Sequence, residues 1–191
     1  MPRKVNWPES GPRVAAIFSV LAGLFFSGAY AEEARLSPIR RTTIMTADPD
    51  ASLKFYRDLL GFTVEYDVLV TDANQLALIS AGSKNGRAIA LRQGAKLGGS
   101  VGLSWVDNLK PQSGACDLTP QAGKTGILIL TDNLQAVYAK LKAAKVTFIS
   151  APVAYDQTRG PTDAFSVFDP NCVRVAFATI QKETFDQSLD K

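Results

Sequence analysis

The sequence predicts an α+β protein in which two βαβββ modules follow one another in a single chain. Each half shows the order strand, helix, strand, strand, strand. The second half repeats this plan at a steady offset, which relates Arg41 to Thr125, Asp48 to Asp132 and Gly61 to Lys145. Half of the chain is too short to bury both a sheet face and a helix, so the repeat indicates duplicated modules in one folded unit.

The first module is expected over residues 37–93 and opens with a strand at 39–46, where β-branched residues are frequent. A helix follows, because Asp48 can accept hydrogen bonds from free backbone amides and Pro49 suits the first helical position. Gly61 ends the helix, since glycine adopts the left-handed conformation at little cost. Three strands complete the module, at 62–70, 75–79 and 87–92.

A linker rich in glycine, serine and proline is expected at 94–123, with residues 101–106 as a short strand or an ordered loop. The second module, 124–180, has a strand at 125–130 and a helix capped by Asp132. Its other strands are expected at 146–149, ending at Pro152, and at 164–168 and 174–179, with a turn at 169–172 between the last two. A polar tail follows at 181–191.

Residues 1–31 are expected to be a secretory signal peptide. Basic residues precede an apolar run at 14–26, which is shorter than the about 20 residues that a membrane span needs. Ala29 and Ala31 form the small-residue pattern at which signal peptidase cleaves. The mature chain is therefore expected to begin at Glu32 and to be periplasmic or secreted. The alternative is a retained membrane anchor.

Composition argues against several classes of function. The chain has 21 Lys and Arg against 18 Asp and Glu, and much of the positive excess lies in the expected signal peptide. The remainder is close to neutral and lacks the basic stripe typical of nucleic-acid binding. No other segment is apolar enough to span a membrane after cleavage. The absence of histidine removes the commonest metal ligand and general base.

Two interpretations of the cysteines Cys116 and Cys172 stay open. In an oxidising compartment they can form a disulfide, but their positions in the sequence do not show whether they lie close together. They can also be two separate small apolar residues. Cys172 has no histidine to activate it as a nucleophile, which favours a structural role.

Two segments resemble signatures of the vicinal oxygen chelate superfamily, which includes glyoxalase, bleomycin-resistance proteins and extradiol dioxygenases. Asp48 and the run at 52–62 are similar to the superfamily's first helix, and residues 160–161 with 168–171 resemble its closing hairpin. The resemblance covers nearly all of the expected domain at 32–180. It implies paired βαβββ modules whose curved sheet surrounds a single cavity.

The resemblance also implies four metal-ligand positions, usually His or Glu, on cavity-facing strands. One lies on the first strand of each module, where this sequence has Arg41 in the first module and Thr125 in the second. The other two lie on the last strand of each module and map to Ala90 and Ala176. These residues lack the imidazole, thiolate or carboxylate that zinc, iron and manganese need. We therefore expect that the usual divalent metal is lost and that the protein has no cofactor.

Three arginines are candidates for binding a ligand in place of the metal. Arg41 occupies a mapped position, and Arg92 and Arg174 each lie two residues from a mapped alanine, on the same face of the strand. Guanidinium groups bind carboxylates or phosphates through paired donors, so this set suits a small organic anion. The alternative is that the arginines pair with acids such as Glu65, Asp67 or Asp163, or point to solvent.

Thr125 and two aromatic residues complete the candidate ligand-binding set. Trp105 and Tyr155 can line an apolar pocket, because binding sites favour aromatic side chains, and Tyr66 is a further candidate. The alternative is that each aromatic ring belongs to the core or its rim, which is the commoner role of such residues.

These observations favour an exported protein that binds a small, anionic or aromatic molecule without catalysis. The alternative is an enzyme of the lyase, isomerase or dioxygenase type with an atypical or metal-free site. A third interpretation is an interaction module whose cavity is filled by side chains. The expected partner is a small-molecule ligand rather than nucleic acid, and the expected assembly is a monomer or homodimer. The sequence does not identify the ligand.

Overall fold

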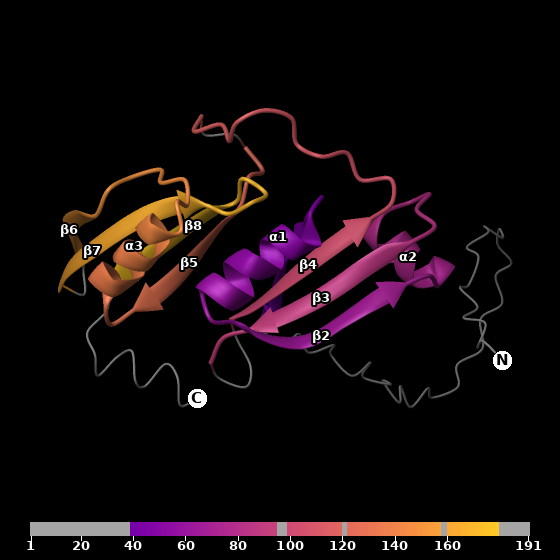
Figure 1. Ribbon diagram of the computed structural model, residues 1–191, viewed down its shortest axis with the longest axis horizontal. Coiled ribbons are helices and arrows are strands. Elements are labelled where there is room, and N and C mark those ends of the chain that lie inside the picture. The colour runs from indigo at the N-terminus through magenta and orange to yellow at the C-terminus, as the bar shows by residue number, and fades with distance from the viewer. Residues whose placement is uncertain (1–38, 95–98, 120–121, 158–159, 180–191) are drawn as a thin grey trace, which may run out of the picture. The chain divides into compact units, whose positions relative to one another are not determined.

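The computed structural model of the protein describes residues 39–94, 99–119, 122–157 and 160–179 (Figure 1). All of them belong to one compact unit, Ser37–Lys191. The expected signal peptide at 1–31, the cleavage site at Glu32 and the polar tail at 181–191 lie outside the described residues.

The first module forms a four-stranded sheet, sheet one. In chain order its strands are β1 (Arg41–Met45), β2 (Thr63–Val70), β3 (Gly86–Arg92) and β4 (Ser100–Val106). In space the order is β1-β4-β3-β2. The β1 strand runs parallel to β4, whereas β3 is antiparallel to both β4 and β2. The last strand of the module therefore lies between its first and third strands.

The second module forms sheet two with the same connectivity. Its strands are β5 (Gly126–Thr131), β6 (Val153–Gln157), β7 (Gly160–Phe168) and β8 (Arg174–Thr179). Their spatial order is β5-β8-β7-β6, with β5 parallel to β8 and the other pairs antiparallel. This match confirms the predicted pair of modules. Over the described residues the two sheets are separate and not closed into one barrel.

The helix of the first module begins and ends where the sequence predicts. It consists of α1 (Pro49–Leu53), which continues as a π-helical segment η1 (Lys54–Leu59). The Asp48 carboxylate accepts a hydrogen bond from the Ala51 amide at 2.9 Å, as an N-cap does. Gly61 follows at φ +83°, a left-handed conformation that glycine adopts without a steric penalty.

The helix of the second module, α3 (Leu134–Ala143), begins one residue later than expected. The Asn133 side chain, not that of Asp132, accepts a hydrogen bond from the Ala136 amide at 3.0 Å. The prediction of Asp132 as the cap is therefore wrong. Because Arg41 and Gly126 each begin the strand that runs parallel to the module's last strand, the structural repeat relates Arg41 to Gly126 rather than to Thr125.

One predicted strand is a helix. Residues 75–79 fall within α2 (Ala73–Ile79), which Asp72 caps by accepting a hydrogen bond from the Gln75 amide. Leu76 is buried and Ile79 packs beside it against the end of sheet one, while Leu78 is 89% exposed. The buried positions therefore have helical spacing, whereas the sequence pattern had indicated alternation.

One strand lies in the expected linker, and another begins later in the chain than predicted. For residues 101–106 the sequence left two alternatives, a short strand or an ordered loop. The structure shows a strand, β4, which pairs with a neighbouring strand on each side and is almost wholly buried. Sheet one therefore extends into the expected linker. In the second module, residues 146–149 contribute one isolated bridge, Phe148 to Val167, and the strand β6 begins only after Pro152. Proline has no amide hydrogen for the ladder, which explains the interruption.

One face of each sheet packs against the module's main helix, as Figure 1 shows for α1 and α3. Apolar residues on these faces and helices join in one core cluster that includes both modules. Its largest fully buried members are Tyr56, Ile89, Leu91, Leu103, Leu141, Phe165 and Phe177. No helix among the described residues is long and apolar enough to cross a membrane.

Candidate functional site

The candidate site lies on the face of sheet one that points away from α1, here called the far face. Strand residues alternate between faces, and the alternate residues Ile44, Ile89, Leu91 and Leu103 belong to the core on the helix side. The far face therefore includes Arg41, Thr43, Met45, Tyr66, Val68, Ala88, Ala90, Arg92, Ser100, Gly102 and Ser104.

A β-bulge in β2 brings two functional side chains to this face. Val64 pairs with Leu91, and the next paired residue on β2 is Tyr66, which lies opposite Ala90. Glu65 is therefore the extra residue of the bulge, and its carboxylate reaches the arginines of the far face. Bulges commonly redirect side chains next to functional sites.

Arg41 extends from β1 across β4 toward β2. Its Nε donates to the Ser100 hydroxyl at 3.3 Å, and its Nη1 donates to the Tyr66 hydroxyl at 2.5 Å. The guanidinium carbon lies 5.2 Å from the centre of the Tyr66 ring, a cation–π distance. This path crosses Gly102, where a Cβ atom would lie only 2.8 Å from the Arg41 Cδ.

Arg41 and Arg92 converge on the Glu65 carboxylate. Arg92 Nε lies 2.5 Å from Glu65 Oε1, and Arg41 Nη2 lies 3.9 Å from Oε2. The hydrogen bond from Arg92 is the main cause that lowers the pKa of Glu65, and the charges of Arg92, Arg41 and Arg40 add to it. Glu65 is therefore ionised at neutral pH.

The three arginines that act on Glu65 carry more positive charge than this carboxylate can neutralise. Arg41 and Arg92 keep 35% and 21% of their side-chain surface exposed, so solvent and small anions can reach them. The alternative interpretation, in which the arginines pair with acids, is therefore observed for Glu65, and ligand binding by these arginines stays a prediction. The pairing with Glu65 is present, and the same pair of guanidinium groups lies together on the far face.

The other candidate residues lie elsewhere. Arg174 is on β8 of sheet two, where its Nε donates to the Ser166 hydroxyl at 3.3 Å. Trp105 has the strand parity of Leu103 and so lies on the helix side of β4, away from the far face. Thr125 is exposed and precedes β5. Tyr155 pairs through its backbone with Thr162 in β6, and its side chain lies outside the described residues.

The structure changes the mapping of the family's four metal-ligand positions. Ala90 lies on the third strand of its module, whereas the last strand is β4, where Gly102 is the far-face residue opposite Thr43. In sheet two, Ala176 pairs with Leu128, so it is the counterpart of Gly102. Gly126 replaces Thr125 as the counterpart of Arg41. Glycine, alanine and arginine side chains do not fit a divalent metal.

Acidic and cysteine residues do not supply a metal site either, over the part of the chain that the structure describes. No group of three or more Cys, Asp or Glu side chains lies close enough there to hold a metal ion. Glu65 is bound to two arginines, a setting that opposes cation binding.

A shallow hollow lies away from the arginines. It has a volume of about 380 Å³ and is lined by Ala51, Lys54, Phe55, Asp58, Leu59 and Ala144. Lys54 and Asp58 are one helical turn apart, so their opposite charges offset each other. The far face has the denser set of hydrogen-bonding groups and is the better candidate.

The two signature segments of the sequence contact each other. The Tyr56 hydroxyl of η1 donates to the buried Asp169 carboxylate at 3.0 Å, and Asn171 Nδ2 donates to the Ser52 hydroxyl at 3.0 Å. Asp169 also accepts hydrogen bonds from the Asn171 and Val173 amides, each at 2.8 Å. This turn therefore joins the first helix to the second module.

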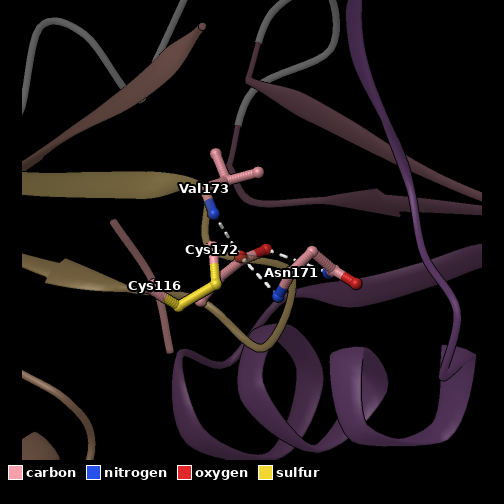
Figure 2. The surroundings of a disulfide bond; sticks show 5 residues. Cys116, Asn171, Cys172 and Val173 are labelled. Atoms are coloured by element: carbon pink, nitrogen blue, oxygen red, sulfur yellow. Dashed lines mark hydrogen bonds between the residues drawn. A yellow bond between two sulfur atoms is a disulfide. The ribbon is translucent and has the colours of Figure 1, made fainter. Parts of the chain in front are cut away.

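A disulfide links Cys116 to Cys172 beside this turn, as Figure 2 shows. The Cα atoms are 5.2 Å apart, and the bond connects the segment between the modules to the Asp169 turn. Of the two interpretations of the cysteines, the disulfide is therefore the one that the structure shows. A disulfide-bonded Cys172 has no thiol for nucleophilic chemistry.

Three residues of the far face were not predicted as main members of the site. Glu65 entered only as an ion-pair partner, Tyr66 only as an additional aromatic candidate, and Ser100 fell in the expected linker. Strand alternation in β2 could have placed Tyr66 correctly. Glu65 faces the same side as Tyr66 only because of the bulge, and the sequence does not indicate a bulge at this position.

Comparison with known proteins supports the family assignment. Residues 39–177 match the model of the Glyoxalase/Bleomycin resistance protein/Dioxygenase superfamily. The fold is similar to that of a glyoxalase family protein from Bacillus cereus, with a TM-score of 0.66, 11% identity, and coverage of 78% of this chain and 97% of that chain. A search of curated protein sequences gives no match.

Two further solved structures share the fold at low sequence identity. For glyoxalase I from Leishmania major the TM-score is 0.54 at 16% identity, with 80% of this chain and 93% of that chain covered. For a glyoxalase family protein from Enterococcus faecalis the TM-score is 0.54 at 17% identity, with 74% and 96% covered. The chain thus belongs to the Glyoxalase/Bleomycin resistance protein/Dioxygenase superfamily.

Proposed function

We propose that the protein binds a small organic anion on the far face of sheet one, without catalysing its conversion. The convergence of Arg41 and Arg92 on a single carboxylate is the observation that supports this function. Two guanidinium groups beside one carboxylate carry more positive charge than that carboxylate has negative charge, which favours the approach of a second anion. The exposed Tyr66 ring beside them provides a surface for an aromatic or apolar part of the ligand.

The binding test measures the affinity for benzoate by isothermal titration calorimetry. Replacing Arg41 with alanine removes a charge-assisted contact worth about 1.5–3 kcal/mol, so the affinity should fall roughly tenfold to a hundredfold. Arg57→Ala is the matched control, because Arg57 is an exposed arginine on η1 that pairs with Asp58. Equal affinities of the Arg41→Ala variant and the wild-type protein would refute the proposed site.

A metal-free enzyme is the second candidate function. Glu65 and Tyr66 are a carboxylate and a phenol on the same face, and such groups can transfer protons to or from a bound substrate. This function requires that purified protein convert carbonyl compounds with an acidic adjacent C–H group, and that Glu65→Gln abolish the conversion. Solvent deuterium exchange into such compounds, followed by NMR, separates the enzyme from the binder.

The proposal includes the absence of a resident divalent metal. The positions that match the family's metal ligands are occupied here by Arg41, Gly102, Gly126 and Ala176. These side chains cannot coordinate a divalent metal, which supports the proposal. Elemental analysis of protein purified without chelators should give far less than one zinc, iron, manganese or nickel per chain. A stoichiometric metal would show that other residues form the site.

Export is a further part of the proposal. The order of basic residues, apolar run and small residues in 1–31 supports a cleaved signal peptide. The Cys116–Cys172 disulfide is in keeping with an oxidising compartment. N-terminal sequencing of the protein from expressing cells should begin at Glu32. A retained leader would contradict periplasmic or secreted localisation.

A further inference from the structure

We propose that the Glu65 carboxylate occupies the position that the carboxylate of the ligand takes when it binds. Ligand binding then displaces Glu65 from the two arginines. This inference rests on the proposed function, because it takes the far face of sheet one as the ligand site. It adds the chemical class of the ligand, an apolar or aromatic carboxylate, and a residue that sets the affinity.

The geometry of the arginine pair fits one planar carboxylate. Arg92 approaches Oε1 of Glu65, while Arg41 approaches Oε2 of the same group. Each guanidinium therefore faces a different oxygen of a single carboxylate. A ligand carboxylate that takes this position makes the same two contacts.

The backbone places Glu65 beside the arginines but does not prevent its side chain from rotating away. Glu65 is the extra residue of the β2 bulge and has no partner residue on β3. Its side chain points to the far face, and cross-strand packing does not fix its position. The Glu65 side chain keeps 31% of its surface exposed. Exposed ion pairs contribute little to stability, so a ligand can replace this one without unfolding the strand.

Apolar side chains near the arginines indicate what is attached to the carboxylate. Tyr66 is 39% exposed, Val68 next to it on the same face is 47% exposed, and Met45 on β1 is 39% exposed. Met45 and Val68 lie at the two ends of one row across the sheet, with Ser104 and Ala88 between them, and Tyr66 lies in the adjacent row beside Ala90. A flat apolar group can lie against such surfaces while its carboxylate meets the arginines.

Removing the negative charge of Glu65 should therefore tighten binding. We expect Glu65→Gln to bind benzoate about tenfold more tightly than the wild-type protein, because the internal competitor loses its charge. Asp67→Asn is the matched control. Asp67 lies two residues away on the same strand, but it pairs with Arg87 and so lies on the helix side. It changes the net charge equally and should leave the affinity for benzoate unchanged.

The outcomes of the titrations separate this inference from the proposed function. If the wild-type protein binds benzoate through Arg41 but Glu65→Gln binds no better than Asp67→Asn, displacement of Glu65 is refuted and the site stands. If none of the proteins binds benzoate, both proposals fail. Inorganic phosphate that binds more tightly than benzoate would refute the carboxylate class. A crystal of the benzoate complex should show the benzoate carboxylate between Arg41 and Arg92, with Glu65 rotated away.

Discussion

At the scale of single residues, Gly102 determines where the Arg41 side chain can lie. A Cβ atom at position 102 would approach both Arg41 Cδ and the Thr43 hydroxyl to 2.8 Å, which is closer than real Cβ contacts. The missing side chain therefore opens the path across β4 by which Arg41 reaches Tyr66. Glycine inside a strand commonly marks such a close approach.

Replacing Gly102 with alanine should weaken anion binding. The new methyl group forces Arg41 out of its path, and we expect the affinity for benzoate to fall severalfold, approaching that of Arg41→Ala. The control is Gly126→Ala, because a Cβ atom there meets its nearest neighbour at an ordinary 3.4 Å. Calorimetry on both variants measures the effect. Unchanged affinity in Gly102→Ala would mean that the position of Arg41 does not matter.

The sequence predicts part of this site and misses the rest for a physical reason. Arg41 and Arg92 were predicted from a family position and from strand alternation, which are local properties. The role of Glu65 depends on a bulge whose position is set by pairing with β3, at residues far along the chain. Trp105 was misplaced because residues 101–106 could not be identified as one of the two central strands of sheet one.

At the scale of elements, helix ends are better predicted when one residue alone can cap them. Asp48 stands before Pro49 without a competing polar neighbour, and the structure confirms it as the cap. Asp132 and Asn133 are adjacent and both good caps, so the sequence cannot separate them. The α2 helix was missed because five residues with alternating leucines satisfy a strand pattern as well as a helical one.

The two neighbouring candidates for the α3 cap give a direct test of the structure. Asn133→Ala should lower the free energy of unfolding by about 1 kcal/mol, because the Ala136 amide loses its acceptor. Asp132→Ala should change it by less than about 0.5 kcal/mol, as an exposed substitution does. Urea denaturation followed by circular dichroism compares the two. The opposite order would restore the cap that the sequence suggested.

At the scale of the whole molecule, the junction between the modules uses the segments that identify the family. The first helix supplies Tyr56 and Ser52, and the closing turn of the second module supplies Asp169 and Asn171. The disulfide at Cys172 holds the same turn. These signature residues therefore have a structural role in this chain, which explains why the fold is predicted by motifs that say little about the ligand.

The charge state of Asp169 governs the strength of this junction. Burial raises the pKa of Asp169, and hydrogen bonds from Val173, Asn171 and Tyr56 act in the opposite direction. Burial also raises the pKa of Tyr56 well above its usual range, and the Asp169 charge adds to the shift. Tyr56 thus stays protonated and remains a donor. Because the folded-state pKa of Asp169 is raised, its ionisation costs stability as the pH rises through that pKa, and the Tyr56 hydroxyl reduces the cost.

Removing this hydroxyl should therefore have a pH-dependent effect on stability. We expect Tyr56→Phe to lower the free energy of unfolding by about 1–3 kcal/mol at neutral pH, where a charged buried carboxylate loses a donor. The loss should shrink as the pH falls below the pKa of Asp169, since the protonated carboxyl depends less on that donor. Tyr138→Phe is the control, because the Tyr138 ring packs on Phe148 at 4.9 Å and has no such carboxylate partner among the described residues.

Denaturation curves of the oxidised variants and the wild-type protein, recorded at neutral and acid pH, provide the differences in stability. Taking differences removes the opposite pH dependence of carboxylates such as Glu65, whose lowered pKa makes its ion pair weaken as the pH falls. A Tyr56→Phe loss of equal size at both pH values would mean that the hydroxyl fills space at the junction without stabilising the Asp169 charge. A loss that grows toward neutral pH, beside a flat Tyr138→Phe profile, places a buried ion–dipole contact between the two signature segments.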